Sequence, residues 1–290
     1  MHSKKYQIAH VHIEVRLPEG MLIPENMSLF EREDLEYADK VIELEVVEDL
    51  APFVRRFQEE YPDAKKFLRK NMNILMSPDK ECRIIAITGQ SAPYAVYVEE
   101  SETLTKSWVH REMLEHTDSD TIFGSLLGLE KVMLRKDCMI LHSAYICKDG
   151  KAILFSAPSE TGKSTQAGLW EKYRGARQIN GDRSLLVREE DGWYANGWPL
   201  CGSSEICYNE AYPIRAIVML YQAKENVVRR LGVGEAMRKV MSQITINMWN
   251  SEFQMKAMDL IQQMVMEVPV YELGCNISED AVACLEQELM

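Results

Sequence analysis

The stretch from Lys151 to Trp170 holds the residues whose types and spacing suit chemistry on phosphate. An apolar run leads into a small-residue turn that matches A-x-x-x-x-G-K-S, a Walker A pattern with alanine for its first glycine. Backbone N–H groups of such a turn, with the positive end of the following helix, bind a polyphosphate. We therefore predict a site for ATP and Mg²⁺, and its nucleotide-binding residues are Ala157, Pro158, Ser159, Glu160, Thr161, Gly162, Lys163, Ser164 and Thr165.

Two residues in this turn depart from the pattern. Ala157 adds a Cβ where glycine permits an unusual backbone angle, and Glu160 puts a carboxylate into a loop meant for phosphates. A chance match is the alternative, but the apolar residues before the turn and the helix-forming residues after it favour a phosphate loop. We expect Glu160 to point away from the nucleotide.

Further chemistry is predicted around this loop. Lys163 is expected to contact the terminal phosphates, and the hydroxyl of Ser164 is suited to ligating Mg²⁺. Asp182 lies one helix and one strand after Lys163, a position from which its carboxylate would reach the same metal ion. The alternative is an aspartate that only forms the turn. His142 precedes the loop by one hairpin and points either to the phosphates or into the core. Arg183 either supplies positive charge or is a surface residue.

The order of these features resembles HPr kinase/phosphorylase and its relatives, whose P-loop domain is similar to that of phosphoenolpyruvate carboxykinase. The likeness is carried by LHSAYICKDGKAILFSAPSETGKST followed by GARQINGD, and it covers about residues 138–221. Members of the family have a histidine on the strand before the loop, a turn G-x-S-G-x-G-K-[ST], a helix, a glycine and a strand ending in paired aspartates. The resemblance implies roles for His142 (phosphate environment), Ser159, Gly162, Lys163 and Ser164 (nucleotide and metal), and Asp182 (metal or acceptor activation).

The chain departs from the family in having one aspartate instead of a pair. The roles of metal ligand and general base therefore cannot be assigned to separate aspartates. Glu205 is either a substitute for the missing carboxylate or a solvated loop residue. The stretch Gly197 to Tyr212 suits an acceptor-binding loop, with an irregular surface loop as the alternative.

The predicted function is that of an ATP-dependent kinase, a phosphotransferase. Asp182, His142 and Lys163 are its candidate catalytic residues, and Ser164 and Asp182 its candidate metal ligands. The γ-phosphoryl group would go to a hydroxyl, serine-type, of a peptide, a small protein or a small molecule. The alternative is a catalytically weak or inactive ATP-binding regulatory protein. Phosphorylase chemistry stays open, and a GTPase is disfavoured because no N-K-x-D signature is present.

The predicted elements place this site in the second part of the chain. Residues 1–120 form a mostly antiparallel, β-rich part, with strands at Tyr6–Leu17, Val41–Val47, Arg83–Thr88, Tyr94–Glu99 and Ser107–Leu114 and some helix within Glu48–Lys70. Residues 121–290 are predicted as α/β, the P-loop nucleotide-binding domain of the HPr kinase/phosphoenolpyruvate carboxykinase-like type. Its helices are expected at Thr121–Lys136, Val233–Trp249, Glu252–Glu267 and from Ser278, and its strands at Cys138–Cys147, Arg177–Val187 with a turn at Asp182, Trp193–Trp198, Ile214–Tyr221 and Val268–Leu273. The fold class is thus α/β, or α+β overall.

The composition limits the class of protein, its partners and its cellular location. The 290 residues are 46% hydrophobic and 27% charged, as in soluble globular proteins, and the net charge of −12 argues against a nucleic-acid partner. No apolar run approaches the about 18 to 20 residues that cross a bilayer, so no membrane is expected and the protein is placed in the cytoplasm. The seven cysteines form no C-x-x-C pair, which favours reduced thiols over a zinc site. A homo-oligomer is expected from the resemblance alone.

Overall fold

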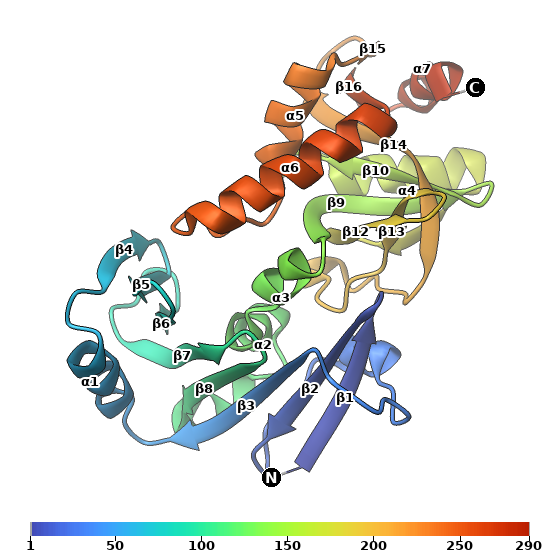
Figure 1. Ribbon diagram of the computed structural model, residues 1–290. Coiled ribbons are helices and arrows are strands. Elements are labelled where there is room, and N and C mark those ends of the chain that lie inside the picture. The colour runs from blue at the N-terminus through green and yellow to red at the C-terminus, as the bar shows by residue number, and fades with distance from the viewer. Residues whose placement is uncertain (1, 290) are drawn as a thin grey trace. The chain divides into compact units, whose positions relative to one another are not determined.

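The computed structural model describes residues 2–289 and is a mixed α/β structure with two eight-stranded sheets (Figure 1). This confirms the predicted mixture of helix and sheet. The chain divides into two compact units, Met1–Val132 and Met133–Met290. The division predicted from the sequence, 1–120 and 121–290, stays a prediction. Among the described residues no helix is both long enough and apolar enough to cross a membrane.

The first unit contains one twisted sheet with a few short helices. Its strand order is β1-β2-β3-β8-β7-β6-β5-β4, in which β3 pairs in parallel with both β2 and β8, while the other neighbours are antiparallel. The strands are β1 (His2–Ile8), β2 (Val11–Leu17), β3 (Lys40–Val47), β4 (Lys65–Arg69), β5 (Met72–Met76), β6 (Glu81–Ala86), β7 (Pro93–Ser101) and β8 (Leu104–His110). The helices are η1 (Glu25–Phe30), α1 (Ala51–Glu60), η2 (Arg111–His116), α2 (Asp120–Leu127) and α3 (Leu129–Arg135).

The first predicted strand is in fact a hairpin. Tyr6–Leu17 was expected as one strand, but β1 ends at Ile8 and β2 begins at Val11, with Ala9 in the left-handed region at φ 53°. The prediction was wrong because Ala9 fits the apolar alternation and no glycine or asparagine marks the turn. The alternation itself is real within β2, whose odd-numbered residues are buried while the intervening ones are half-buried.

The predicted helix Thr121–Lys136 is broken into α2 and α3. Gly128 ends α2 in the left-handed conformation, and a Cβ at this position would lie 2.6 Å from the ring of Tyr97. Glycine therefore meets two needs here, a positive φ and a close approach to an aromatic ring.

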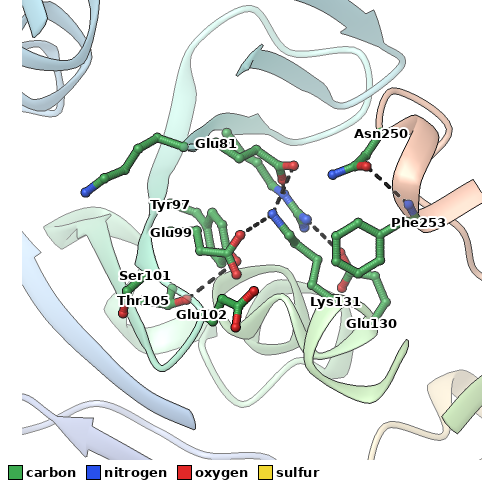
Figure 2. Close-up of polar contacts among 12 residues, drawn as sticks. Glu81, Tyr97, Glu99, Ser101, Glu102, Thr105, Glu130, Lys131, Asn250 and Phe253 are labelled. Carbon is green, nitrogen blue, oxygen red and sulfur yellow. Dashed lines mark hydrogen bonds and ion pairs between the residues drawn. The ribbon is translucent and has the colours of Figure 1, made fainter. Parts of the chain in front are cut away.

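A chain of buried ion pairs ties α3 to the sheet of the first unit (Figure 2). Lys131, 2% exposed, binds Glu81 at 3.1 Å and also contacts the carboxylate of Glu99. The chain of alternating charges extends from β3 to α3 through Lys40, Glu99, Lys131, Glu81, Arg83 and Glu130. Each buried charged side chain in this series of ion pairs thus has at least one partner of opposite charge, as a low-dielectric interior requires.

The second unit carries the predicted phosphate site. Its strands are β9 (Cys138–Lys148), β10 (Lys151–Ser156), β11 (Arg177–Asn180), β12 (Arg183–Glu189), β13 (Gly192–Asn196), β14 (Ala211–Gln222), β15 (Val227–Arg230) and β16 (Val270–Cys275). Its helices are α4 (Lys163–Arg174), η3 (Gly202–Ser204), α5 (Val233–Met241), α6 (Ser251–Glu267) and α7 (Glu279–Leu289). The strand pairs of β10 with β9 and β14, β9 with β12, β12 with β13, and β13 with β14 close a ring.

Three layers build the core of this unit. Side chains such as Leu154 and Ile217 face the helices α5 and α6, whereas their neighbours Phe155 and Val218 face α4 and α7. Strands β10 and β14 are buried on both faces, which explains why their sequences are continuous apolar runs with no alternation. In Figure 1 helices α5 and α6 lie together on one side of β14 and β16.

One helix of the second unit is shorter than expected. Val233–Trp249 was predicted as a single helix, but α5 ends at Met241, the chain turns at Ser242 and Gln243, and it then passes beside β9, where Ile244 pairs with Leu141. The prediction failed because Ile244 and Ile246 keep an apolar pattern through a segment that is not helical. The predicted turn at Asp182 between two strands is confirmed by β11 and β12.

Candidate functional site

The loop between β10 and α4 holds the residues of the Walker A pattern. Strand β10 ends at Ser156, the connection spans residues 157–162, and α4 begins at Lys163. Gly162 caps the helix at φ 112°, a backbone angle that favours glycine. The first N–H groups of α4 have no partner within the helix and carry its positive dipole end, so the loop meets the physical requirements of an anion site.

Lys163 lies folded back over the loop. Its side chain is 7% exposed, and Nζ donates hydrogen bonds to the carbonyl oxygens of Ala157 at 3.2 Å and Pro158 at 3.3 Å. Burial lowers the pKa of Lys163, the negative charge of Asp182 opposes that effect, and the positive charge of Arg183 adds to it. The ammonium group is therefore within electrostatic reach of Asp182, and a phosphate would supply the strong counter-charge that it lacks.

Asp182 occupies the turn between β11 and β12. The side-chain oxygen of Asn180 accepts hydrogen bonds from the backbone N–H groups of Asp182, at 3.1 Å, and Arg183, at 3.0 Å, which fixes the turn. Each oxygen of the Asp182 carboxylate has one nitrogen close to it. Nε2 of His142 lies 3.3 Å from Oδ1, and Nε of Arg183 lies 3.2 Å from Oδ2. Burial raises the pKa of Asp182, but the hydrogen bond from His142 and the charges of Arg183, His142 and Lys163 outweigh it and hold the pKa below its ordinary value.

His142 stands where β10 ends. The carbonyl oxygen of His142 accepts a hydrogen bond from Oγ of Ser156 at 2.8 Å, and His142, which belongs to β9, pairs in register with Arg183 on the neighbouring strand β12. The structure thus brings together three residues that the sequence singled out, His142, Lys163 and Asp182, at the start of the loop. The alternative of a core histidine does not describe this ring, whose Nε2 faces the Asp182 carboxylate.

Backbone strain in the loop lies at a different residue from the one expected. Ala157 is buried but is not in the left-handed region, so its Cβ causes no backbone strain, and the earlier interpretation of this position was wrong. Glu160 has φ 63° instead. Counted along the turn G-x-S-G-x-G-K-[ST], Glu160 stands where the pattern has its second glycine, which is the signal that sequence reasoning missed. The Glu160 side chain is exposed.

A second loop packs against Asp182. A Cβ at Gly181 would clash with Oγ of Ser204, and a Cβ at Gly202, where φ is 61°, would lie 3.5 Å from the carboxylate of Asp182. Gly181 therefore allows the 3₁₀ turn η3 to approach the Asp182 turn, and Gly202 provides the positive φ at the start of η3; neither glycine was singled out from the sequence. Glu205 follows this turn, exposed and with φ 56°.

Thr245 is a further member of the site that the sequence did not indicate. Its Oγ1 accepts a hydrogen bond from Nη1 of Arg183 at 3.1 Å, so the guanidinium lies between Thr245 and Asp182. The expectation of one long helix hid this contact. Poor helix formers at Ser242, Thr245 and Asn247 are the signal that could have revealed the break.

The donors for a metal ion are few. Within residues 2–289 no group of three or more His, Cys, Asp and Glu side chains is placed to hold a metal. Ser164 is exposed in the first turn of α4, and Asp182 is ionised at neutral pH, as an ordinary aspartate is, with a lowered pKa that stabilises this form further. A hydroxyl and one carboxylate fit Mg²⁺ that takes its remaining ligands from phosphate and water, a common arrangement in nucleotide sites. Thr165 is also exposed on this turn.

Comparison with known proteins identifies the family. The model of the SynChlorMet cassette protein ScmC matches residues 112–289, which is more than half of the chain. The chain therefore belongs to the ScmC family. Among solved structures it is similar to the Hpr(Ser) kinase/phosphatase from Coxiella burnetii, with 10% identity and a TM-score of 0.31 over 51% of this chain and 95% of that chain. At that score the likeness supports no argument about function. A comparison with curated proteins found no match.

Proposed function

We propose that this protein is an ATP-dependent kinase that transfers the γ-phosphoryl group to a serine-type hydroxyl. The acceptor is a peptide, a small protein or a small molecule. The observation that supports the proposal most strongly is the convergence of Lys163, Asp182 and His142 at the loop between β10 and α4. The finer fold assignment, a P-loop domain of the HPr kinase and phosphoenolpyruvate carboxykinase-like type, belongs to the same proposal, as does action in the cytoplasm without nucleic acid.

Each residue has a role that follows from its position. The backbone N–H groups of the loop and of α4 bind the phosphates, and Lys163 leaves the carbonyls of Ala157 and Pro158 to pair with them. Ser164 and Asp182 would hold Mg²⁺, which when bound neutralises phosphate charge. Arg183, fixed by Thr245, adds positive charge beside the reacting group.

The transfer requires a proton acceptor near the attacking hydroxyl. The hydroxyl oxygen forms a bond to the γ-phosphorus, the bond from that phosphorus to the bridging oxygen of ADP breaks, and the hydroxyl proton passes to the pair formed by Asp182 and His142. Asp182 is ionised, and His142 can share the proton through the contact at 3.3 Å. Positioning and electrostatics supply most of the rate in such reactions, so a single carboxylate is sufficient in principle.

The experiment separates nucleotide binding from transfer. ATP affinity is measured by calorimetry for the wild type and Lys163→Ala, with Lys172→Ala on the same helix as the control. Loss of the phosphate contact should weaken ATP binding about tenfold or more, because charge-assisted hydrogen bonds contribute about 1.5–3 kcal/mol. Labelled ATP with serine peptides and hydroxyl metabolites then tests transfer. Unchanged affinity in Lys163→Ala would overturn the proposed site.

The second candidate is a nucleotide-binding regulatory protein that transfers nothing. It is favoured by the occupation of both Asp182 oxygens by His142 and Arg183 and by the strained, negatively charged Glu160 in the loop. This candidate predicts ATP binding without turnover on every acceptor, and no change in either quantity for Asp182→Asn.

A further inference from the structure

Three parallel strands of the second unit end at the same edge of the sheet. Strand β14 pairs in parallel with β10 on one side and with β16 on the other. The loop that follows β10 is the candidate phosphate site, while residues 223–226 follow β14 and residues 276–278 follow β16. Ligands of α/β sheets bind outside the carboxyl ends of parallel strands. Both further segments are therefore placed to contact a ligand whose phosphates lie in the loop.

Side-chain contacts attach both segments to the phosphate site. Gln166, three residues after Lys163 on α4, is 2% exposed, and its Nε2 donates a hydrogen bond to the carbonyl oxygen of Asn276 at 3.3 Å. Nε2 of Gln222, the last residue of β14, donates to the carbonyl oxygen of Glu160 at 3.5 Å. The segment after β16 is thus held against the beginning of α4, and the end of β14 against the loop.

A network of hydrogen bonds fixes the two segments to each other. The side-chain oxygen of Asn226 accepts from the backbone N–H of Asn276 at 3.0 Å, and Nδ2 of Asn276 donates to the carbonyl oxygen of Lys224 at 2.9 Å. The hydroxyl of Ser278 donates to Oδ1 of Asn276 and accepts from Nδ2 of Asn226 at 3.3 Å. The polar side chains of Asn226, Asn276 and Ser278 are therefore bonded within the protein, and the segments are positioned before any ligand binds.

Ile277 is the residue that this network presents to solvent. Its side chain is 79% exposed, between Asn276 and Ser278, which both bond within the network. A single exposed isoleucine is ordinary on a protein surface. This one is distinguished by its place, because its neighbour Asn276 is bonded to the helix that begins at Lys163. A purine has two apolar faces that gain free energy from contact with an aliphatic side chain, so Ile277 is suited to contact a purine ring.

We propose that Ile277 contacts the purine base of the nucleotide whose phosphates bind the loop after β10. The inference rests on the proposed function and extends its nucleotide from ATP to the purine nucleoside triphosphates. The amide and hydroxyl side chains beside Ile277 are already bonded to one another, which leaves the base an apolar contact. Such a contact does not distinguish the hydrogen-bonding edges of adenine and guanine, so the site accepts ATP and GTP alike.

The test compares the binding of ATP, GTP and inorganic tripolyphosphate, each with Mg²⁺, by calorimetry. Tripolyphosphate has the phosphates and no base, so its affinity measures the loop alone. We expect Ile277→Ser to weaken ATP and GTP binding about tenfold, the effect of losing about 1.4 kcal/mol of apolar contact, and to leave tripolyphosphate affinity unchanged. Met266→Ser, an exposed change on α6, is the control and should alter none of the three affinities.

A second measurement locates the base in the unchanged protein. The photoreactive analogue 8-azido-ATP should label a peptide that contains residues 276–278, as read by mass spectrometry, and excess ATP or GTP should each suppress the labelling. Labelling of another surface would overturn the contact at Ile277. A preference of about tenfold or more for one of the two nucleotides would show that hydrogen bonds read the base, and would overturn the apolar contact.

The outcomes separate this inference from the proposed function. If ATP, GTP and tripolyphosphate bind with equal affinity and Lys163→Ala weakens all three, the phosphate site stands and the base contact is overturned. If Ile277→Ser weakens tripolyphosphate as much as ATP, the residue only supports the loop, and the base contact is again overturned. If none of the three ligands binds, the proposed function fails and the base contact fails with it.

Discussion

His142 on β9 faces Asp182 in the turn just before β12, with Nε2 of the histidine 3.3 Å from Oδ1 of the aspartate. The backbone reinforces this contact, because the N–H of Ser143 donates to the carbonyl of Asp182 at 3.0 Å. Two side chains from distant parts of the sequence are therefore fixed by sheet register, and the ionised form of Asp182 is stabilised before any ligand binds.

Replacing Asp182 by asparagine should abolish most phosphoryl transfer. The amide keeps the size of the side chain but loses the charge and the proton-accepting oxygen, so turnover should fall by about 10²–10⁴-fold, the usual contribution of a positioned acid or base. Asp259→Asn, an exposed change on α6, is the matched control. Single-turnover kinetics with labelled ATP measure the effect, and a decrease of less than tenfold would remove Asp182 from the transfer step.

The lowered pKa of Asp182 also gives stability a defined pH dependence. A carboxyl whose pKa is lower in the folded than in the unfolded chain stabilises the fold above its unfolded pKa, and that contribution is lost as the pH falls through the folded pKa. The difference in unfolding free energy between wild type and Asp182→Asn should therefore be largest at pH 6–7 and shrink below about pH 4. Urea unfolding at several pH values measures it, and a constant difference down to pH 3 would contradict the assignment.

Lys163 should take up protons when nucleotide binds at alkaline pH. Burial holds its pKa below the ordinary value in the free protein, and phosphates would raise it by stabilising the charged form. Calorimetric titrations with ATP near pH 9, in buffers of different ionisation enthalpy, report the number of protons exchanged. Uptake should be present in the wild type and absent in Lys163→Arg, whose guanidinium stays charged at all relevant pH values.

Glycine at position 160 should improve both stability and nucleotide binding. Glu160 adopts φ 63°, which costs a non-glycine residue about 1 kcal/mol, and its carboxylate adds negative charge to a phosphate loop. Glu160→Gly should therefore raise ATP affinity by several fold and not lower the unfolding free energy. Glu160→Gln separates charge from backbone, because it removes only the carboxylate. Equal ATP affinity in all three proteins would show that neither effect reaches the nucleotide.

The elements around the site could be predicted because local sequence determines them. Strand β10, the capping Gly162 and the Asp182 turn follow from an apolar run, a helix start and turn-forming residues. The contacts that complete the site depend on long-range pairing instead. Nothing in the local sequence places Thr245 beside Arg183, because that contact depends on residues 243–245 pairing with β9.

The same distinction holds in the first unit. The pairing of β6 with β7 could be predicted from the sequence, because two strand-like runs are joined by a turn-rich segment. The parallel pairing of β3 with β2 and β8 was not, because strand order is decided by crossovers that leave no local pattern. The buried ion pairs could not be predicted from the sequence either, because Lys131, Glu81 and Glu99 lie in separate segments that come together only when the chain folds.

This buried ion-pair chain gives the last prediction. Lys131→Met would leave Glu81 and Glu99 buried without one of their cations, and removing one member of a buried pair typically costs about 3–5 kcal/mol. Arg111→Met, which removes the solvent-exposed pair with Glu48 in the same unit, should cost less than about 1 kcal/mol. Urea unfolding at neutral pH compares the two variants. Because Glu81 retains Arg83 and Glu99 retains Lys40, equal small losses would mean that those remaining cations neutralise the carboxylates without Lys131.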